Sequence, residues 1–300
     1  MRNLPVPSRD ECKDHLVKSI YTYNYKGPRG HKLTEEDIKS VIALYNLYDQ
    51  KLGAANDELK AANLAESLKE TIKTAYGKTY EGGMLHSIRT ALFANVDKCP
   101  ICGIQPVTEL DHHLPESQFS VLAIYTRNLV PLCGPCNKKK LAYFGEEDGS
   151  KDNFIHAYFD ALPNAQFIKA KVDLTGKSLA VEFYVDHHPQ LSKENANRIS
   201  QQIKALNLNA RYSKEINTYL TGHAVTMHTL FSVAGKTALK GWLQATAAHA
   251  QEAYYHNYWT SVLLDGLATH DEFIDGGFIQ VFPVQKKIID DFLGSGTAKA

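Results

Sequence analysis

The sequence has no excess of charge, because its 33 Lys and Arg residues are balanced by 33 Asp and Glu residues. A protein that coats nucleic acid by electrostatics alone would be more basic, so the composition argues against that class. Any contact with nucleic acid must come from a local patch. The run Lys138–Lys140 is the clearest one.

Long apolar stretches are also missing. No run approaches the roughly 18–20 apolar residues that a membrane-spanning helix needs, and residues 1–5 do not resemble the start of a signal peptide. We therefore expect a cytoplasmic protein without membrane contact. The sequence shows no internal repeat and no low-complexity tract. With 300 residues, 44% of them hydrophobic, it can bury a substantial core in two or three domains.

Cysteine is scarce, and its placement is informative. Of five cysteines, four form two Cys-x-x-Cys pairs, Cys99/Cys102 and Cys133/Cys136. In a reducing cytoplasm such pairs bind metal rather than oxidise, and two of them complete a tetrahedral zinc site. All four positions would be filled by protein, so the zinc is expected to be structural. Cys12 stands alone and is interpreted as an ordinary thiol.

The thirty residues between the two pairs exceed the spacing of a simple zinc ribbon. They include Asp111, a hard oxygen ligand for a divalent ion, followed by His112, an imidazole that can take a proton near neutral pH. Asn128 and Asn137 add amide oxygens, and Lys140 adds a cation. Phosphodiester hydrolysis needs a base, a metal and a cation that bears the developing charge.

Three segments carry a family resemblance. Cys-Pro-Ile-Cys-Gly begins at Cys99, Leu-Asp-His-His-Leu-Pro-Glu-Ser begins at Leu110, and Arg-Asn-Leu-Val-Pro-Leu-Cys-Gly-Pro-Cys-Asn-Lys-Lys-Lys begins at Arg127. Together they resemble the zinc-bearing HNH endonucleases of the ββα-metal (His-Me finger) type. That family has Asp-His-x-x-Pro, then Asn-Leu, then Cys-x-x-Cys-Asn/His-x-x-Lys.

The resemblance implies a role for each residue. His112 would be the general base, and Asp111 with Asn137 would hold one catalytic divalent ion. Asn128 would orient the base, and Lys140 would contact phosphate. Asp111 and His112 would lie on the first strand of the finger, Asn128 in the loop or second strand, and Asn137 on the helix.

Two departures from the family pattern matter. Glu116 stands where such proteins commonly have lysine, which removes a positive charge near the site. Asn137 replaces a histidine, so the second metal site would have oxygen ligands alone, which favours Mg²⁺ or Mn²⁺ over Ni²⁺ or Zn²⁺. His113 is an alternative base, but the Asp-His-x-x-Pro register favours His112.

The resemblance extends loosely outside the motif. Residues 154–160 and 259–278 are similar to segments of full-length bacterial HNH proteins, some of which occur beside an ATPase in Septu-like anti-phage defence systems. This wider resemblance implies a role in defence and a partner ATPase.

The remaining sequence predicts mostly helices and one β-hairpin. Thr34-Glu35-Glu36-Asp37 is typical of a helix start. Further helices are predicted at about 55–76 and 84–95. The β-rich runs 167–172 and 179–185, separated by a segment that contains Gly176, predict a hairpin, and helices follow to about residue 269.

The predicted fold is therefore α+β: a mainly helical chain with a central zinc-stabilised ββα-metal finger and a β-hairpin C-terminal to it. We expect a helical region at 1–95, the zinc-bound HNH finger at 96–145 and an α+β region at 146–300.

The predicted function is a metal-dependent endonuclease that cuts DNA, with Zn²⁺ as structural cofactor and Mg²⁺ or Mn²⁺ as catalytic cofactor. One alternative keeps the chemistry and changes the substrate to RNA, such as tRNA, because the finger contacts backbone rather than bases. Another is a catalytically idle, zinc-stabilised module that binds nucleic acid or protein.

Overall fold

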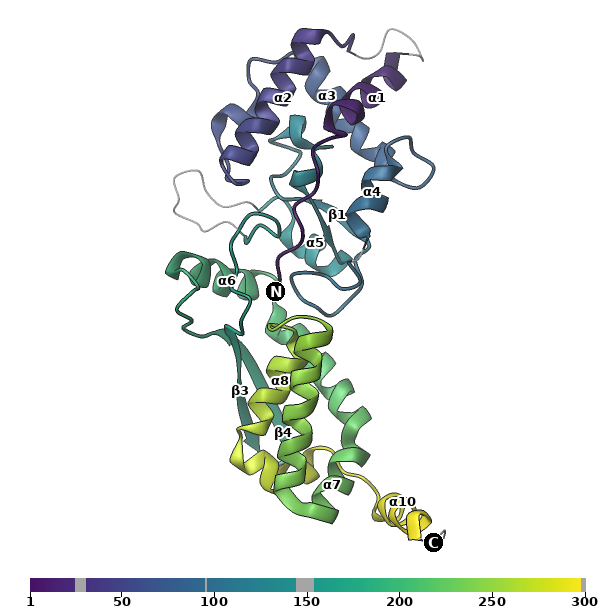
Figure 1. The fold of residues 1–300 in the computed structure, drawn as a ribbon, viewed down its shortest axis with the longest axis vertical. Coiled ribbons are helices and arrows are strands. Elements are labelled where there is room, and N and C mark those ends of the chain that lie inside the picture. The colour runs from purple at the N-terminus through teal and green to yellow at the C-terminus, as the bar shows by residue number, and fades with distance from the viewer. Residues whose placement is uncertain (25–30, 95, 144–153, 298–300) are drawn as a thin grey trace. The chain divides into compact units, whose positions relative to one another are not determined.

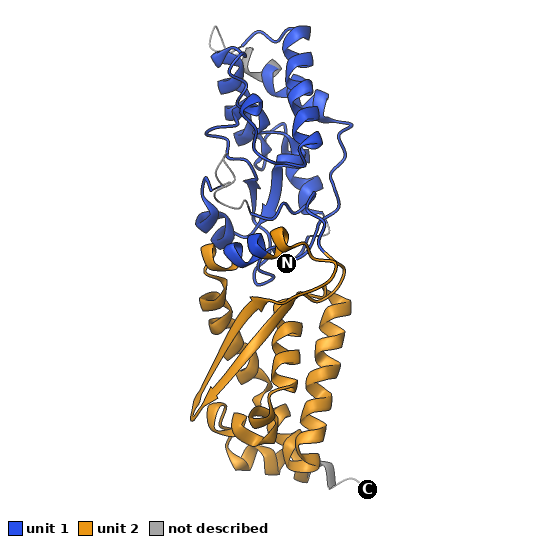
Figure 2. Cartoon of the chain, turned by 90° about the vertical axis from the view of Figure 1, so that its left-hand side faces the viewer, with its two compact units in different colours: residues 1–162, 197–202 blue, residues 163–196, 203–300 orange. Residues whose placement is uncertain are grey.

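The computed structural model describes residues 1–24, 31–94, 96–143 and 154–297 (Figure 1). Their contacts group the chain into two compact units (Figure 2), residues 1–162 with 197–202 and residues 163–196 with 203–300. The expected helical region at 1–95 and the expected finger at 96–145 thus share one unit. The expected domain boundary after residue 145 lies outside the described residues.

The first unit begins with helices. They are α1 (Cys12–Asn24), α2 (Glu35–Gln50), η1 (Asp57–Lys60), α3 (Glu66–Ala75), η2 (Tyr76–Thr79) and α4 (His86–Phe93). The predicted start of α2 is confirmed, because the Thr34 hydroxyl accepts from the Asp37 N–H and the Asp37 side chain accepts from the Thr34 N–H. The stretch expected as one helix at 55–76 is instead interrupted after η1, where Ala61 has a φ of +53°.

The helices of the first unit share their hydrophobic core with the segment that joins the cysteine pairs. Leu16 of α1 and Val41 of α2 belong to the same buried cluster as Phe119 and Leu122. The rings of Tyr45 and Tyr125 stack with their centroids 4.1 Å apart. This shared core explains why the two segments form one unit rather than two.

Two short strands and a helix complete the first unit. β1 (Glu109–His112) pairs antiparallel with β2 (Leu129–Leu132), with Asp111 opposite Val130. Between them lie η3 (Ser120–Leu122) and η4 (Thr126–Asn128), and α5 (Gly134–Lys140) follows β2 and contacts β1.

The second unit contains the predicted hairpin, β3 (Ile168–Thr175) and β4 (Ser178–Val185). Gly176, with a φ of +60°, begins its two-residue turn, a conformation that favours glycine. Its helices are α7 (Leu208–Ala253), interrupted at Ala234 and Gly235, α8 (Trp259–Ala268), the π-helix η5 (Phe273–Gly277), α9 (Phe278–Val281) and α10 (Lys286–Thr297). Helix α6 (Lys193–Ala205) contributes residues 197–202 to the first unit.

In the second unit α8 contacts β3 and α7 contacts β4, so helices pack on the hairpin. The described chain is mainly helical with two small antiparallel sheets. This confirms the expected α+β class.

Candidate functional site

The four paired cysteines converge on one point. Cys99, Cys102, Cys133 and Cys136 are all buried, and their sulfur atoms lie within 4.8 Å of one another. Four thiolates at the usual zinc–sulfur distance would be spaced by about 3.8 Å, and the Sγ atoms of Cys102 and Cys133 are 3.6 Å apart. The geometry therefore fits a tetrahedral metal such as zinc. It is the only cluster of three or more His, Cys, Asp or Glu ligands among the residues that the structure describes.

Local backbone structure orients each cysteine pair toward the shared point. Gly103, with a φ of +67°, donates its N–H to the Cys99 carbonyl, which closes the first turn. Cys133 precedes α5, and Cys136 lies in its first turn. A bound ion would hold the start of α5 against the turn that precedes β1. The predicted zinc-binding role of the four cysteines is supported by this cluster.

His112 lies at the end of β1 with its ring largely buried. Its Nε2 is 2.9 Å from the Ala123 carbonyl oxygen. Because a carbonyl only accepts, Nε2 must carry the proton, and in the neutral ring Nδ1 then has a free lone pair. Burial lowers the pKa of His112 to about 4, although the hydrogen bond to Ala123 opposes this shift. At neutral pH the ring can therefore accept a proton at Nδ1.

Asp111 and Lys140 form a buried ion pair. The Lys140 ammonium is 3.0 Å from Asp111 Oδ2 and also donates to the His112 carbonyl oxygen at 2.7 Å. Burial raises the pKa of Asp111 to about 6, and the charge of Lys140 limits the rise. Lys140, predicted to contact phosphate, thus binds the β1 carboxylate in this arrangement.

Asn137 faces β1 from the first half of α5. Its Nδ2 donates to a carboxylate oxygen of Glu109. The negative charge of Glu109 also raises the pKa of Asp111. The structure therefore brings both predicted ligands of the catalytic ion to the interface of β1 and α5. Glu109 was not a predicted site residue. Its position two residues before Asp111 on a strand, hence on the same face, is the signal that could have identified it.

Asn128 is fully buried and its carboxamide makes four hydrogen bonds. Oδ1 accepts from the Leu114 N–H at 2.8 Å and from the Tyr48 hydroxyl at 3.1 Å. Nδ2 donates to the carbonyl oxygens of Leu114 at 3.0 Å and Leu122 at 3.3 Å. Asn128 thus binds both sides of the β1–β2 connection. Leu122 precedes Ala123, whose carbonyl accepts a hydrogen bond from His112. Asn128 therefore influences His112 only indirectly.

A buried histidine extends this network. The Tyr158 N–H donates to His156 Nδ1, so Nε2 carries the proton and donates to the Tyr48 hydroxyl at 2.9 Å. The His156 ring also lies 4.0 Å from that of His113, and burial lowers the pKa of both. His113, the alternative base, is therefore packed inside the unit.

No family model, no curated protein and no solved structure matches this chain. Within the described ranges, no helix combines the length and apolar character required to cross a membrane.

Proposed function

We propose that this chain is a divalent-metal-dependent endonuclease of the HNH type that hydrolyses phosphodiester bonds in DNA. The observation that carries the proposal is His112: a neutral imidazole at the end of β1 with an unprotonated Nδ1, next in sequence to Asp111. The arrangement of β1, β2 and α5 around a cysteine cluster, which we interpret as a zinc-stabilised ββα finger, supports it.

In the proposed reaction His112 accepts a proton from the attacking water at Nδ1. The Ala123 carbonyl keeps Nε2 protonated and stabilises the imidazolium that results, and the Glu116 carboxylate, 3.7 Å from Nε2, adds to this effect. Asn128 maintains the β1–β2 connection that supplies the carbonyl.

The donor set at the β1–α5 interface fits a hard cation, because Asp111 and Asn137 offer oxygen atoms. Mg²⁺ or Mn²⁺ held there would stabilise charge on the scissile phosphate and the leaving oxygen. Asp111 and Asn137 would hold this ion, and Lys140, which pairs with Asp111 in the structure, would then be available to bind a phosphate oxygen.

The test is a cleavage assay on the purified, zinc-loaded chain, with plasmid DNA and tRNA in Mg²⁺, in Mn²⁺ and in EDTA. We expect DNA cleavage that requires the divalent ion and is abolished by His112→Ala. His187→Ala, which removes an exposed histidine of the second unit, is the matched control and should cleave normally. Cleavage of tRNA alone would transfer the proposal to RNA.

The proposed setting is anti-phage defence with control by a partner ATPase. It depends on the resemblance of the segments outside the motif. The assay is therefore run with and without the product of a neighbouring ATPase gene. Absence of cleavage in both conditions, or equal cleavage by His112→Ala, would contradict the nuclease proposal.

One observation favours a second candidate, a catalytically idle zinc module that binds nucleic acid or protein. Lys140 already neutralises Asp111, so the site is electrostatically satisfied without a second metal. This candidate predicts that Asp111→Asn leaves function intact and that Mn²⁺ does not bind. Loss of cleavage in Asp111→Asn with retained zinc would exclude it.

A further inference from the structure

A pocket of about 510 Å³ lies between the N-terminal segment and helix α4 of the first unit. One wall is formed by residues 4–8 and 10–12 with His15 of α1, and the opposite wall by residues of α4. The volume lies within the range typical of small-molecule sites. None of the described residues that line it belongs to the candidate catalytic site.

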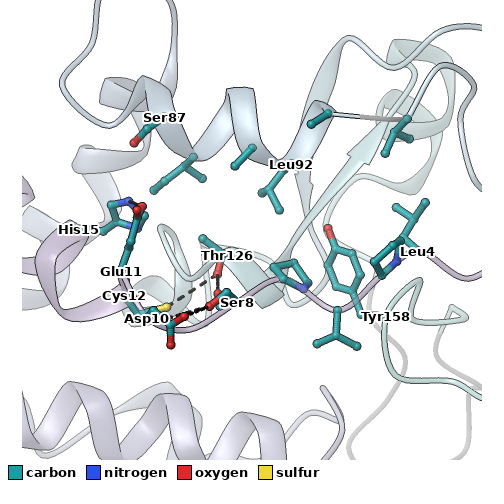
Figure 3. Close-up of a pocket in the computed structure, with 17 residues that line it drawn as sticks. Leu4, Ser8, Asp10, Glu11, Cys12, His15, Ser87, Leu92, Thr126 and Tyr158 are labelled. Atoms are coloured by element: carbon teal, nitrogen blue, oxygen red, sulfur yellow. Dashed lines mark hydrogen bonds and ion pairs between the residues drawn. The ribbon is translucent and has the colours of Figure 1, made fainter.

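The pocket has a polar end and an apolar end. Figure 3 shows the labelled polar residues Ser8, Asp10, Glu11 and His15 together on one side of the view, away from Leu4. The apolar wall consists of Leu4, Pro5, Val6, Pro7, Ile88, Ala91, Leu92, Ala94 and Val96. A ligand that fits must therefore combine an apolar body with a polar group at one end.

The polar end carries negative charge. Asp10 and Glu11 are the charged residues among the described lining, which includes no lysine or arginine. The Ser8 hydroxyl donates to Asp10 at 2.7 Å, and Glu11 lies 3.2 Å from His15 Nε2. These two carboxylates favour a cation as the polar group of the ligand.

His15 adds to this preference. Its side chain is buried, and because Glu11 accepts from Nε2, the neutral ring has its lone pair on Nδ1. No described residue donates to this buried nitrogen. Burial also lowers the pKa of His15, so the ring contributes no opposing charge at neutral pH. His15 lines the polar end of the pocket, so a cation seated against Glu11 meets no opposing charge from its ring.

We propose that this pocket binds a small amphipathic amine, with its ammonium group at Asp10, Glu11 and His15 and its apolar body against Leu92 and its neighbours. The pocket is a second site of the first unit, independent of the proposed nuclease chemistry.

The test uses the full-length, zinc-loaded chain and three fluorescent probes of one shape: 2-(1-naphthyl)ethylamine, the corresponding naphthyl alcohol and 3-(1-naphthyl)propanoate. Binding is measured by fluorescence anisotropy and calorimetry at pH 7. We expect saturable 1:1 binding of the amine. The alcohol should bind about tenfold more weakly and the carboxylate not measurably, because a hydrogen bond to a charged group adds about one factor of ten or more.

Two variants locate the site. The double variant D10N/E11Q should weaken amine binding about tenfold and leave alcohol binding unchanged, since only the charge is removed. Its matched control is D271N/E272Q, which alters an exposed Asp-Glu pair of the second unit and changes the net charge by the same amount. Leu92→Trp, which fills the apolar end, should abolish binding of both probes.

Each outcome decides the proposal. Equal binding of amine and alcohol, or equal weakening by the two double variants, overturns it, as does the absence of saturable amine binding. The acidic residues altered in D10N/E11Q are exposed, so this variant is expected to fold even if Leu92→Trp does not.

Discussion

Replacement of Asn128 by alanine should destabilise the first unit far more than the loss of one small side chain suggests. The change removes four hydrogen bonds and leaves buried groups of Leu114 and Leu122 without their partner. Four bonds at a net loss of about 1 kcal/mol each, with about 1–3 kcal/mol more for one buried group left unpaired, give a total of about 5–7 kcal/mol. This is a large part of the stability of a typical domain.

Asn209 offers a matched control in the second unit. Its carboxamide also binds backbone, but makes two hydrogen bonds, accepting from the Phe183 N–H at 2.9 Å and donating to the Phe183 carbonyl at 3.1 Å. It is only half-buried, so water can replace part of what is lost. We expect Asn209→Ala to cost about 1–2 kcal/mol.

The two units can be observed separately. Both tryptophans of the chain, Trp242 and Trp259, lie in the second unit, so their fluorescence during urea unfolding reports that unit. Hydrogen exchange of peptides from residues 113–132 reports the first. Asn128→Ala should accelerate exchange in 113–132 and leave the tryptophan transition unchanged, while Asn209→Ala should do the reverse. Equal losses in the two variants, or less than about 1 kcal/mol for Asn128→Ala, would refute this reasoning.

Three further predictions concern the metal cluster, the ion pair and a tight turn. Purified protein should contain one zinc ion per chain by atomic absorption, and Cys99→Ser should lower this content and expose the segment between the cysteine pairs to proteolysis. Lys140→Met should destabilise by about 3–5 kcal/mol in urea unfolding by leaving Asp111 buried and unpaired, and D111N/K140M should recover much of this loss; no recovery would contradict the ion pair. Gly53→Ala should lower the melting temperature more than Gly82→Ala: both have positive φ, but only at Gly53 would the new Cβ clash with the buried ring of His156.

Sequence patterns were informative where the determinants are local. The cysteine cluster follows from two Cys-x-x-Cys turns, the start of α2 from the spacing of Thr34 and Asp37, and the hairpin from alternating residues around Gly176. The helix start and the hairpin involve groups close in sequence. The cysteine cluster involves a residue spacing that is typical of a metal site.

Contacts between distant segments were not predictable in this way. Tyr48 reaches Asn128 across 80 residues and His156 across 108. No local pattern distinguishes such a tyrosine from any other buried one on an amphipathic helix. The sequence does not predict the pairing of Asp111 with Lys140 for a related reason: the family resemblance gives each residue an external ligand, which leaves out their attraction for each other.

The shared core of the first unit has a consequence for the order in which the chain is made. Helices α1 to α4 bury their apolar faces against residues as late as Leu129, so their core is incomplete until that residue has been synthesised. The last cysteine of the cluster, Cys136, follows seven residues later. At a synthesis rate of about 5–20 residues per second, the two events are separated by about one second. The core would then be completed and the metal bound almost together. Until that point, the apolar faces of helices α1 to α4 remain exposed to solvent.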